Sequence, residues 1–374
     1  MASMSSSIPA WLKKAQDRDH INTVLRVLTD REQTRYRARS MSQRQSDLSL
    51  KHRLAQLPSR IISNNHLTQQ YSVAVGSKPE NQMYNRYSDI IPYDQTMVDV
   101  DGRYLNANWV RERAGGCLTV ATQAPLPHTA HEFLSTIVTR GIRVVAQLTQ
   151  NYEGGRQKAH VYFPSVPGDS WTIQPYDGEG TFPPLLVTLQ KVESIDSAHC
   201  MVSTVSVADL SGDSSKRPFV FRHMLYDAWP DHGVPAPEDR AGLLNFIRLA
   251  DELNREIPQV TGTDIKAYPP MIVNCSAGVG RTGAFIALCS LLRANGILPK
   301  CNDSDHPSNS DTQPLPDSPL GPLPETVGWD PVAQEIDSLR EQRPGMVQRP
   351  EQVLLIYDVL ATAWAAKDGV ETNA

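Results

Sequence analysis

Apolar residues recur at helical spacing near both ends of the 374-residue chain. Residues 9–40 place apolar side chains at this spacing among Lys, Arg, Asp and Glu, which predicts one or two amphipathic helices. Residues 332–340 and 350–366 are also predicted to be helical. The stripe expected to be buried in the last of these helices comprises Val353, Leu354, Tyr357, Leu360, Ala361 and Trp364.

The region between residues 71 and 227 has a different pattern, in which short apolar runs are broken by Gly, Pro and Asp. Runs of this kind predict strands. We expect strands over residues 104–110, 118–121, 144–148, 185–189, 200–207 and 219–225. Residues 133–140 follow a Pro-rich turn and predict a helix. Strands mixed with helices favour an α/β or α+β layer fold.

Residues 299–328 form a proline-rich stretch that fits neither pattern. Seven prolines lie between residues 299 and 324, among Ser, Asp and Asn. Such a composition buries too little apolar surface to offset the entropy of ordering, so we expect a disordered insertion. A neutral surface insertion is the simpler interpretation, and a binding site for a partner that reads proline motifs is the alternative.

The chain therefore divides into three parts. Residues 1–69 are expected to form a basic helical arm with a polar linker, residues 70–366 a domain that contains the insertion, and residues 367–374 a tail. Residues 1–60 carry 12 Lys or Arg against 5 Asp or Glu, although the whole chain has a net charge of −5. A basic segment could contact acidic partners, a membrane surface or nucleic acid. A solvated helical arm is the simpler interpretation, and no nucleic-acid partner is expected.

Composition and cysteine usage narrow the class of protein. Hydrophobic residues make up 40% and charged residues 21% of the chain, as in soluble globular proteins. No run approaches the ~18 consecutive apolar residues of a transmembrane helix, and residues 1–10 lack the pattern of a secretory signal. Five cysteines without CxxC spacing argue against a disulfide framework and a zinc site, so we expect a reduced, cytoplasmic protein. The cysteines expected to be buried and inert are Cys117, Cys200, Cys289 and Cys301.

Residues 271–283 carry the most informative motif, with the sequence MIVNCSAGVGRTG. A short apolar strand leads into a glycine-rich loop, and an apolar helix follows. Backbone N–H groups of such a loop, together with the helix N-terminus, form a cradle for an anion. The three glycines also match the dinucleotide pattern GxGxxG, but no strand and acidic residue follow at the required spacing. The Walker pattern fails as well, because no Lys precedes Thr282.

Cys275 lies at the start of this loop, six residues before Arg281. A helix N-terminus and a nearby guanidinium lower the pKa of a thiol, which would make Cys275 a nucleophile rather than an inert buried cysteine. The planar fork of Arg281 can hold two phosphoryl oxygens while the sulfur attacks the phosphorus. The loop therefore indicates chemistry on a phosphate ester.

These residues resemble the signature loop of the protein tyrosine phosphatase family, and other segments resemble further family motifs in the same order. The segments are NRYSD at 85–89, YLNAN at 104–108, ATQAP at 121–125, EGGRQK at 153–158, YFP at 162–164, WPDHGVP at 229–235 and QRPGMVQRPEQ at 342–352. The resemblance implies the fold of that family, a central mixed twisted sheet flanked by helices. It also implies a single catalytic domain of the non-receptor kind.

The resemblance implies an enzyme that hydrolyses phosphotyrosine in proteins through a cysteinyl-phosphate intermediate, in signal transduction. Cys275 would be the nucleophile, Arg281 would bind the phosphate, and Asp231 would act first as general acid and then as base. Gln348 would position the attacking water. Thr282 would donate a hydrogen bond to the departing thiolate.

Substrate contacts are expected from the same loop and from two further motifs. Tyr87 would stack against the phosphotyrosine ring, Asp89 would accept hydrogen bonds from the substrate backbone, and Gln352 would have a supporting role. The loop residues expected to contact the phosphate are Ser276, Ala277, Gly278, Val279, Gly280 and Arg281. The family resemblance implies no cofactor and no metal, and the expected partners are phosphotyrosine-containing proteins.

Two residues depart from the family pattern. Asn274 stands where the family usually has His, which predicts a higher pKa for Cys275 than is typical of the family. Ser88 stands where some relatives carry a basic residue, which predicts only a weak preference for acidic residues beside the phosphotyrosine. Because of Asn274, the alternative that the protein binds phosphotyrosine but is catalytically weak also stays open. A dual-specificity or lipid phosphatase shares the C-x5-R loop, but the motif at 85–89 speaks against it.

Overall fold

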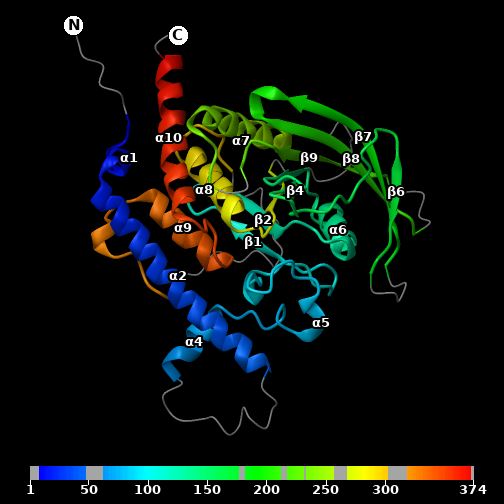
Figure 1. Cartoon of the computed structure of the whole chain (residues 1–374), viewed down its shortest axis with the longest axis horizontal. Coiled ribbons are helices and arrows are strands. Elements are labelled where there is room, and N and C mark those ends of the chain that lie inside the picture. The colour runs from blue at the N-terminus through cyan, green and yellow to red at the C-terminus, as the bar shows by residue number, and fades with distance from the viewer. Residues whose placement is uncertain are drawn as a thin grey trace.

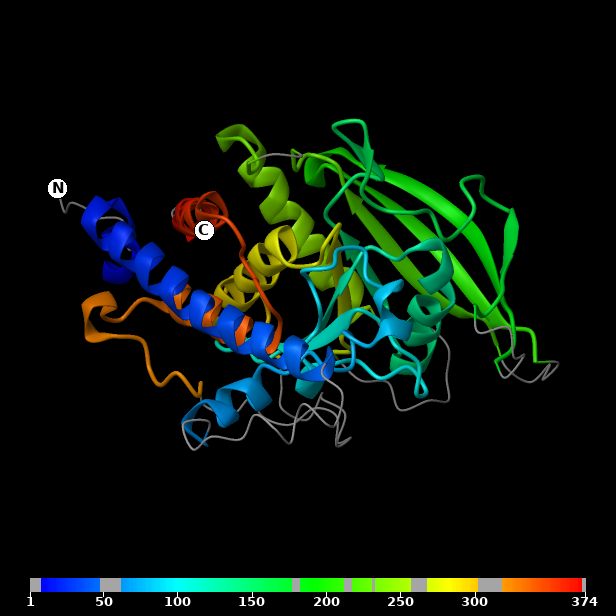
Figure 2. The same cartoon turned by 60° about the horizontal axis from the view of Figure 1, so that its bottom comes forward.

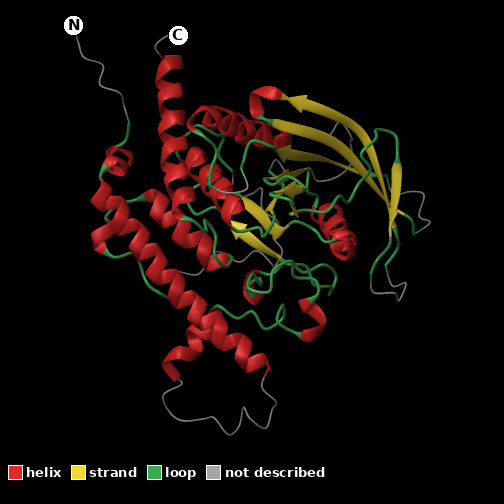
Figure 3. Ribbon diagram, viewed as in Figure 1, coloured by secondary structure: helices red, strands yellow, loops and turns green. Residues whose placement is uncertain are grey.

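The computed structural model describes residues 8–47, 62–176, 182–211, 217–230, 233–256, 268–301 and 318–371. Eight strands form one twisted sheet with helices on both faces (Figures 1 and 3). The order in the sheet is β1-β2-β10-β3-β9-β8-β7-β6. The strands are β1 (Ala107–Arg111), β2 (Leu118–Gln123), β3 (Val144–Gln147), β6 (Ser170–Ile173), β7 (Leu185–Ile195), β8 (Cys200–Asp209), β9 (Phe219–Tyr226) and β10 (Met271–Cys275). Strands β4 (Tyr152–Glu153) and β5 (Arg156–Gln157) form a separate short hairpin.

The sheet is mixed, as the family resemblance implies. The four central strands β2, β10, β3 and β9 run parallel to one another. Strand β1 pairs antiparallel with β2, and β8, β7 and β6 continue antiparallel beyond β9. The predicted fold class is therefore confirmed, and all six strands predicted between residues 71 and 227 are present with shifted ends. The exposed strand β6 and the hairpin of β4 and β5 have no strong apolar pattern and were not predicted.

Alternating residues of the central strands face two separate cores. Val273 and Cys275 of β10 pack against the helices α7 (Arg240–Arg255), α8 (Gly280–Ala294), α9 (Pro331–Gln342) and α10 (Pro350–Glu371). Ile272 faces the opposite side and packs into the core that α6 (Ala130–Arg140) covers. This alternation places the nucleophile candidate Cys275 on the same face as the helix that follows it.

Local sequence signals explain where these helices begin and end. Asp330 caps α9, because its carboxylate accepts a hydrogen bond from the backbone N–H of Ala333 at 3.0 Å, and Pro331 follows at the first helical position. Gly141 ends α6 in a left-handed conformation with φ of 66°. Among the described residues, no helix combines the length and hydropathy needed to cross a membrane.

The N-terminal segment packs into the main core instead of forming a solvated arm. It comprises α1 (Ala10–Lys13) and α2 (Arg18–Asp47), and α2 lies alongside α9 (Figure 2). Val24 and Leu28 are fully buried in the core that α9 shares. Arg35, with no exposed surface, binds Asp337 of α9 at 2.6 Å. Part of the basic charge is therefore neutralised inside the molecule.

Two short helices, α4 (Ile62–Gln70) and α5 (Pro79–Gln82), follow α2 along the chain. The expected helix over 350–366 is present as α10, but Leu354 is 39% exposed, so its assignment to the buried stripe is wrong. Leu355 and Ile356 are buried in its place. Residues 302–317 of the expected proline-rich insertion lie outside the described residues. Residues 318–328 are ordered against the fold, because Val327 is buried in the core and Arg31 donates to the carbonyls of Leu320 and Gly321, so disorder is wrong for this part.

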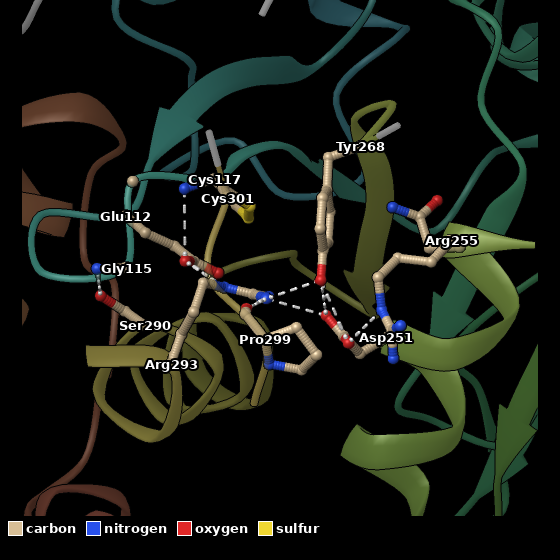
Figure 4. The surroundings of a disulfide bond; sticks show 12 residues. Glu112, Gly115, Cys117, Asp251, Arg255, Tyr268, Ser290, Arg293, Pro299 and Cys301 are labelled. Atoms are coloured by element: carbon tan, nitrogen blue, oxygen red, sulfur yellow. Dashed lines mark hydrogen bonds and ion pairs between the residues drawn. A yellow bond between two sulfur atoms is a disulfide. The ribbon is translucent and has the colours of Figure 1, made fainter. Parts of the chain in front are cut away.

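The cysteines show a second correction. Cys117 and Cys301 form a disulfide with a Cα–Cα distance of 5.5 Å (Figure 4). Neither is therefore an inert unpaired thiol, and the expectation of a fully reduced protein is wrong for this pair. Cys117 precedes β2, which pairs in parallel with β10. Helix α8 starts just after the end of β10 and is about 22 Å long, so it runs back along the sheet. The chain after α8 thus comes back to the end of the sheet where β2 starts. A separation of 184 residues gave no local signal for this pairing.

Candidate active site

The motif at 271–283 forms the predicted strand, loop and helix. Cys275 ends β10, residues 276–279 form the loop, and α8 begins at Gly280. Because β2, β10 and β3 are parallel, the loop lies at the carboxyl ends of three neighbouring strands, where α/β sheets bind ligands. Gly278 has a φ of 70°, and a Cβ atom there would collide with the backbone of Thr122. This position therefore requires glycine.

The thiol of Cys275 is buried, with 6% of the residue exposed. Burial opposes the thiolate, but the hydroxyl of Thr282, the charge of Arg281 and the backbone N–H groups of Thr282 and Val279 favour it. Their combined effect holds the pKa of Cys275 below the ordinary value of a thiol. By contrast, burial raises the pKa of Cys289 well above that value.

Arg281 is held in a fixed orientation by a buried carboxylate. Its Nη1 donates to Glu153 Oε1 at 2.7 Å, and its Nη2 donates to Glu153 Oε2 at 2.9 Å. Nη1 also donates to the carbonyl of Leu148, and Nη2 to the carbonyl of Pro230, both at 2.9 Å. A two-pronged pair of this kind fixes the plane of the guanidinium. The contact with Pro230 joins the candidate phosphate-binding arginine to the segment that carries Asp231.

A second arginine holds the Cys275 loop through hydrogen bonds to its backbone carbonyls. Arg343, just after α9, is fully buried and donates to the carbonyl of Gly278 at 2.7 Å and that of Ala277 at 3.1 Å. The same guanidinium donates to Asn108 Oδ1 at 2.8 Å and Asn106 Oδ1 at 2.9 Å. Burial lowers its pKa to about 10, so it remains charged at neutral pH. The loop carbonyls are therefore turned inward, which is consistent with backbone N–H groups facing the substrate side.

Ser276 connects the loop to the segments on either side of it. Its hydroxyl lies 2.8 Å from the hydroxyl of Tyr87 and donates to the carbonyl of Lys158 at 2.8 Å. Gln123, at the end of β2, accepts from the N–H of Arg86 and donates to the carbonyl of Tyr84, both at 2.8 Å. The structure thus places the half-exposed ring of Tyr87 at the edge of the Cys275 loop.

The other predicted residues differ in how closely the structure ties them to the loop. The loop that carries Gln348 is anchored next to it, where the N–H of Val347 donates to the carbonyl of Val279 at 3.2 Å, and Gln348 is exposed. The buried amide of Gln352 lies against Gly280. Asp89 is exposed on the segment after Tyr87. Asp231 lies outside the described residues.

Asn274 lies in β10, directly before the nucleophile candidate, and is only 1% exposed. Among the described residues, neither polar atom of its side chain has a hydrogen-bond partner. An unpaired buried amide is costly, so this position does not contribute the support that a hydrogen bond would give. Its predicted effect on the pKa of Cys275, relative to the family, stays a prediction.

Three residues that matter to this geometry were not singled out from the sequence. Glu153 orients Arg281, Arg343 holds two carbonyls of the loop, and Gln123 fixes the segment before Tyr87. All three lie in segments that resemble family motifs. Their side chains act through other residues, so no pattern of spacing reveals them. In the described part of the chain, no cluster of three or more His, Cys, Asp or Glu could hold a metal ion.

Comparisons with known proteins identify the family. The family model of protein-tyrosine phosphatase matches residues 81–296. Human tyrosine-protein phosphatase non-receptor type 14 is 32% identical over 217 residues, which cover 56% of this chain and 17% of that protein. Human non-receptor type 18 is 29% identical over 297 residues, covering 78% of this chain and 53% of that protein. The chain thus spans about half, or much less, of these relatives.

Among solved structures, the catalytic domain of human non-receptor type 18 superimposes with a TM-score of 0.56 at 28% identity. The match covers 78% of this chain and 88% of that domain. A structure described as the same phosphatase in complex with HER2 phosphopeptides gives a TM-score of 0.57 at 26% identity, over 78% of this chain and 85% of the solved chain. From its fold, its Cys275 loop and a family match over more than half of its length, this chain belongs to the protein-tyrosine phosphatase family.

Proposed function

We propose that this protein hydrolyses phosphotyrosine in proteins, with Cys275 as the nucleophile. The observation that carries the proposal is the thiol itself, whose pKa is held below its ordinary value beside an arginine fixed by Glu153. A thiolate next to a guanidinium and a helix N-terminus is suited to attack a phosphate dianion. The match to a phosphatase bound to phosphopeptides supports phosphotyrosine proteins as the substrate class.

In the first step, the Cys275 sulfur attacks phosphorus as the bond from phosphorus to the tyrosyl oxygen breaks. Arg281 and the loop N–H groups hold the equatorial oxygens, and Asp231 protonates the leaving oxygen. In the second step, water positioned by Gln348 attacks the cysteinyl-phosphate, and Asp231 takes its proton. Inorganic phosphate leaves, and Thr282 stabilises the restored thiolate.

The remaining expectations about the site belong to the same proposal. Tyr87 lines one side of the pocket, and Asp89 binds the substrate backbone. Residues 276–281 bind the phosphate, with Gln352 supporting the start of α8. The names of the relatives reported above, both non-receptor phosphatases, favour a cytoplasmic role in signal transduction. The divisions 1–69, 70–366 and 367–374 are kept as proposed segments of the chain, the first of which packs against the second through α2.

The test measures phosphate release from a phosphotyrosine peptide and from a phosphoserine peptide, with EDTA present. Wild type should act on phosphotyrosine alone, Cys275→Ser should be inactive, and Asp231→Ala should be slowed by about 10²–10⁴-fold. Cys289→Ala, which removes a buried thiol from α8, is the matched control and should keep its activity. Peptide binding without turnover by wild type would show a binding protein, and release from phosphoserine would show dual specificity.

A further inference from the structure

A cluster of aromatic rings includes Tyr84, three residues before Tyr87 along the chain, and has no part in the mechanism above. We call it the Tyr176 shelf. It consists of the rings of Tyr84, His128 and Tyr176 together with Met83, whose carbonyl lies against His128. The ring of Tyr176 meets Tyr84 edge-on at 6.3 Å and lies 5.3 Å from the ring of His128. The rings of Tyr84 and His128 are 5.7 Å apart.

The Tyr176 shelf is open to solvent on one side. Tyr176 is 53% exposed and Met83 is 48% exposed, whereas Tyr84 and His128 are half-buried. Exposed apolar side chains that gather in one place commonly mark a binding surface. Aromatic rings and methionine sulfur both make favourable contacts with a further aromatic ring.

The shelf is linked to the Cys275 loop by the short segment between Tyr84 and Tyr87. Ser276 contacts Tyr87 and Lys158, as described above, and Arg86, just before Tyr87, contacts His160, two residues after Lys158. Arg86 Nη2 donates to His160 Nδ1 at 3.0 Å and to the carbonyl of Pro125 at 2.8 Å. Burial and the charge of Arg86 lower the pKa of His160, so its ring is mainly neutral at pH 7. These contacts connect the loop to the chain segment that carries Tyr84.

The part of the shelf around Tyr84 is held in place by hydrogen bonds. Gln123 fixes the carbonyl of Tyr84, and His128 Nε2 lies 2.9 Å from the carbonyl of Met83. Behind Tyr84, the buried ring of Tyr104 lies 6.4 Å away, and its hydroxyl donates to Asn85 at 2.6 Å. A surface fixed in this way loses little conformational entropy when a ligand binds.

A substrate peptide emerging from the pocket can reach this surface. Tyr84 precedes Tyr87 by three residues, so their Cα atoms are at most about 11 Å apart. An extended peptide covers that distance in about three or four residues. The occupant that the position of the shelf favours is therefore part of the substrate itself.

We propose that the Tyr176 shelf binds an aromatic side chain located within about four positions of the phosphotyrosine in the substrate. The inference rests on the proposed function and extends it to substrate selection. The bound side chain would lie against the exposed part of Tyr176 and the side chain of Met83. Arg86 and His160 would form the passage between the shelf and the pocket.

The experiment compares phosphopeptides in which one phenylalanine replaces alanine, in turn, at each of about four positions on either side of the phosphotyrosine. Phenylalanine at one or two positions should raise kcat/KM about three- to tenfold over alanine. Tyr176→Ala should remove that ratio, whereas Tyr176→Phe should retain it. Trp171→Ala, which removes another exposed aromatic ring on β6, is the matched control and should leave the ratio unchanged. Turnover of 4-nitrophenyl phosphate normalises each variant for correctly folded enzyme.

Equal kcat/KM values across the set, or a phenylalanine effect that survives Tyr176→Ala, would overturn the inference. Enhancement by glutamate but not by phenylalanine at the same positions would also overturn it, because it would assign selection to Arg86 and not to the rings. If no phosphotyrosine peptide is hydrolysed, the proposed function fails, and with it the inference that rests on it. Hydrolysis of all peptides at one rate would reject the substrate-selection inference and leave the proposed function intact.

Discussion

At the scale of single residues, the site depends on side chains that hold other side chains in place. Cys275 and Arg281 would carry the proposed chemistry. Glu153 fixes the orientation of Arg281, and the hydroxyl of Thr282 lowers the pKa of Cys275. Each of these supporting contacts can be removed by a nearly isosteric substitution. The following predictions use such substitutions so that the fold is disturbed as little as possible.

Glu153→Gln removes the charge that faces Arg281 while keeping the shape of the side chain. The bidentate pair then loses one charge-assisted hydrogen bond, worth about 1.5–3 kcal/mol. We expect kcat/KM for a phosphotyrosine peptide to fall by about 10- to 100-fold. Steady-state kinetics measure the effect, with the exposed Glu80→Gln as control. Activity equal to wild type would show that Arg281 is oriented without Glu153.

Thr282→Val removes a hydroxyl that favours the thiolate of Cys275. Without it the pKa of the thiol rises, and a smaller fraction is deprotonated at any pH below that value. The acid limb of the profile of kcat/KM against pH should therefore move to higher pH. The rate of Cys275 alkylation by iodoacetamide should move in the same direction. Thr282→Ser, which keeps the hydroxyl, should leave both profiles near those of wild type.

Asn274→His tests the departure from the family pattern. A protonatable ring before the nucleophile would favour the thiolate, whereas the amide carries no charge and has no partner among the described residues. We expect the alkylation profile of Cys275 to move to lower pH in this variant. An unchanged profile would rule out a role for position 274 in setting the thiol pKa.

At the scale of elements, α2 and α9 are joined by buried ion pairs. Arg35 binds Asp337 and Glu341, and Tyr71 donates to Glu341 at 2.6 Å. Because α9 ends at the residue before Arg343, this contact stabilises the element that supports the Cys275 loop. The N-terminal helix is thus connected to the candidate site through α9.

Arg35→Ala should destabilise the folded protein by about 3–5 kcal/mol, because it leaves carboxylates of α9 buried with less compensation. The matched control Arg37→Ala removes an exposed arginine two residues along the same helix and should change stability by less than about 0.5 kcal/mol. Urea unfolding gives both values. Equal losses for the two variants would contradict the importance of this ion pair.

At the scale of the whole molecule, the Cys117–Cys301 disulfide closes a long loop through the core region. It joins the start of β2 to the chain that follows α8. Nearby, Arg293 of α8 donates to Glu112 at 3.1 Å and to Asp251 at 2.9 Å (Figure 4). The disulfide and these ion pairs hold the C-terminal end of α8 at the end of the sheet where β2 starts, opposite the end that carries the Cys275 loop.

Reduction of this disulfide should lower stability by about 2–4 kcal/mol, because the unfolded chain regains conformational freedom. Thermal unfolding with and without dithiothreitol should therefore show a lower Tm in reductant. Cys117→Ser should abolish the difference, and Cys200→Ser, which removes an unpaired thiol, should preserve it. A Tm of wild type that does not respond to dithiothreitol would contradict the prediction.

The sequence alone determined the fold class, most strands and helices, and the nucleophile loop. Apolar periodicity is a local property, so β10, α8, α9 and α10 could be recognised from short windows. The proximity of Cys275 and Arg281 is also local, because six residues of one loop bring them together. For the same reason, the motif resemblance was enough to indicate the family before any contact was known.

Only the tertiary structure decided the contacts between distant segments. Glu153 and Arg281, Arg35 and Asp337, and Cys117 and Cys301 are each separated by more than 100 residues. The exposure of Leu354 was also decided by the tertiary structure, because the packing of neighbouring helices determines which apolar side chains of α10 are buried. Burial and pairing across the chain depend on how elements pack in three dimensions, and one-dimensional spacing does not encode that packing explicitly.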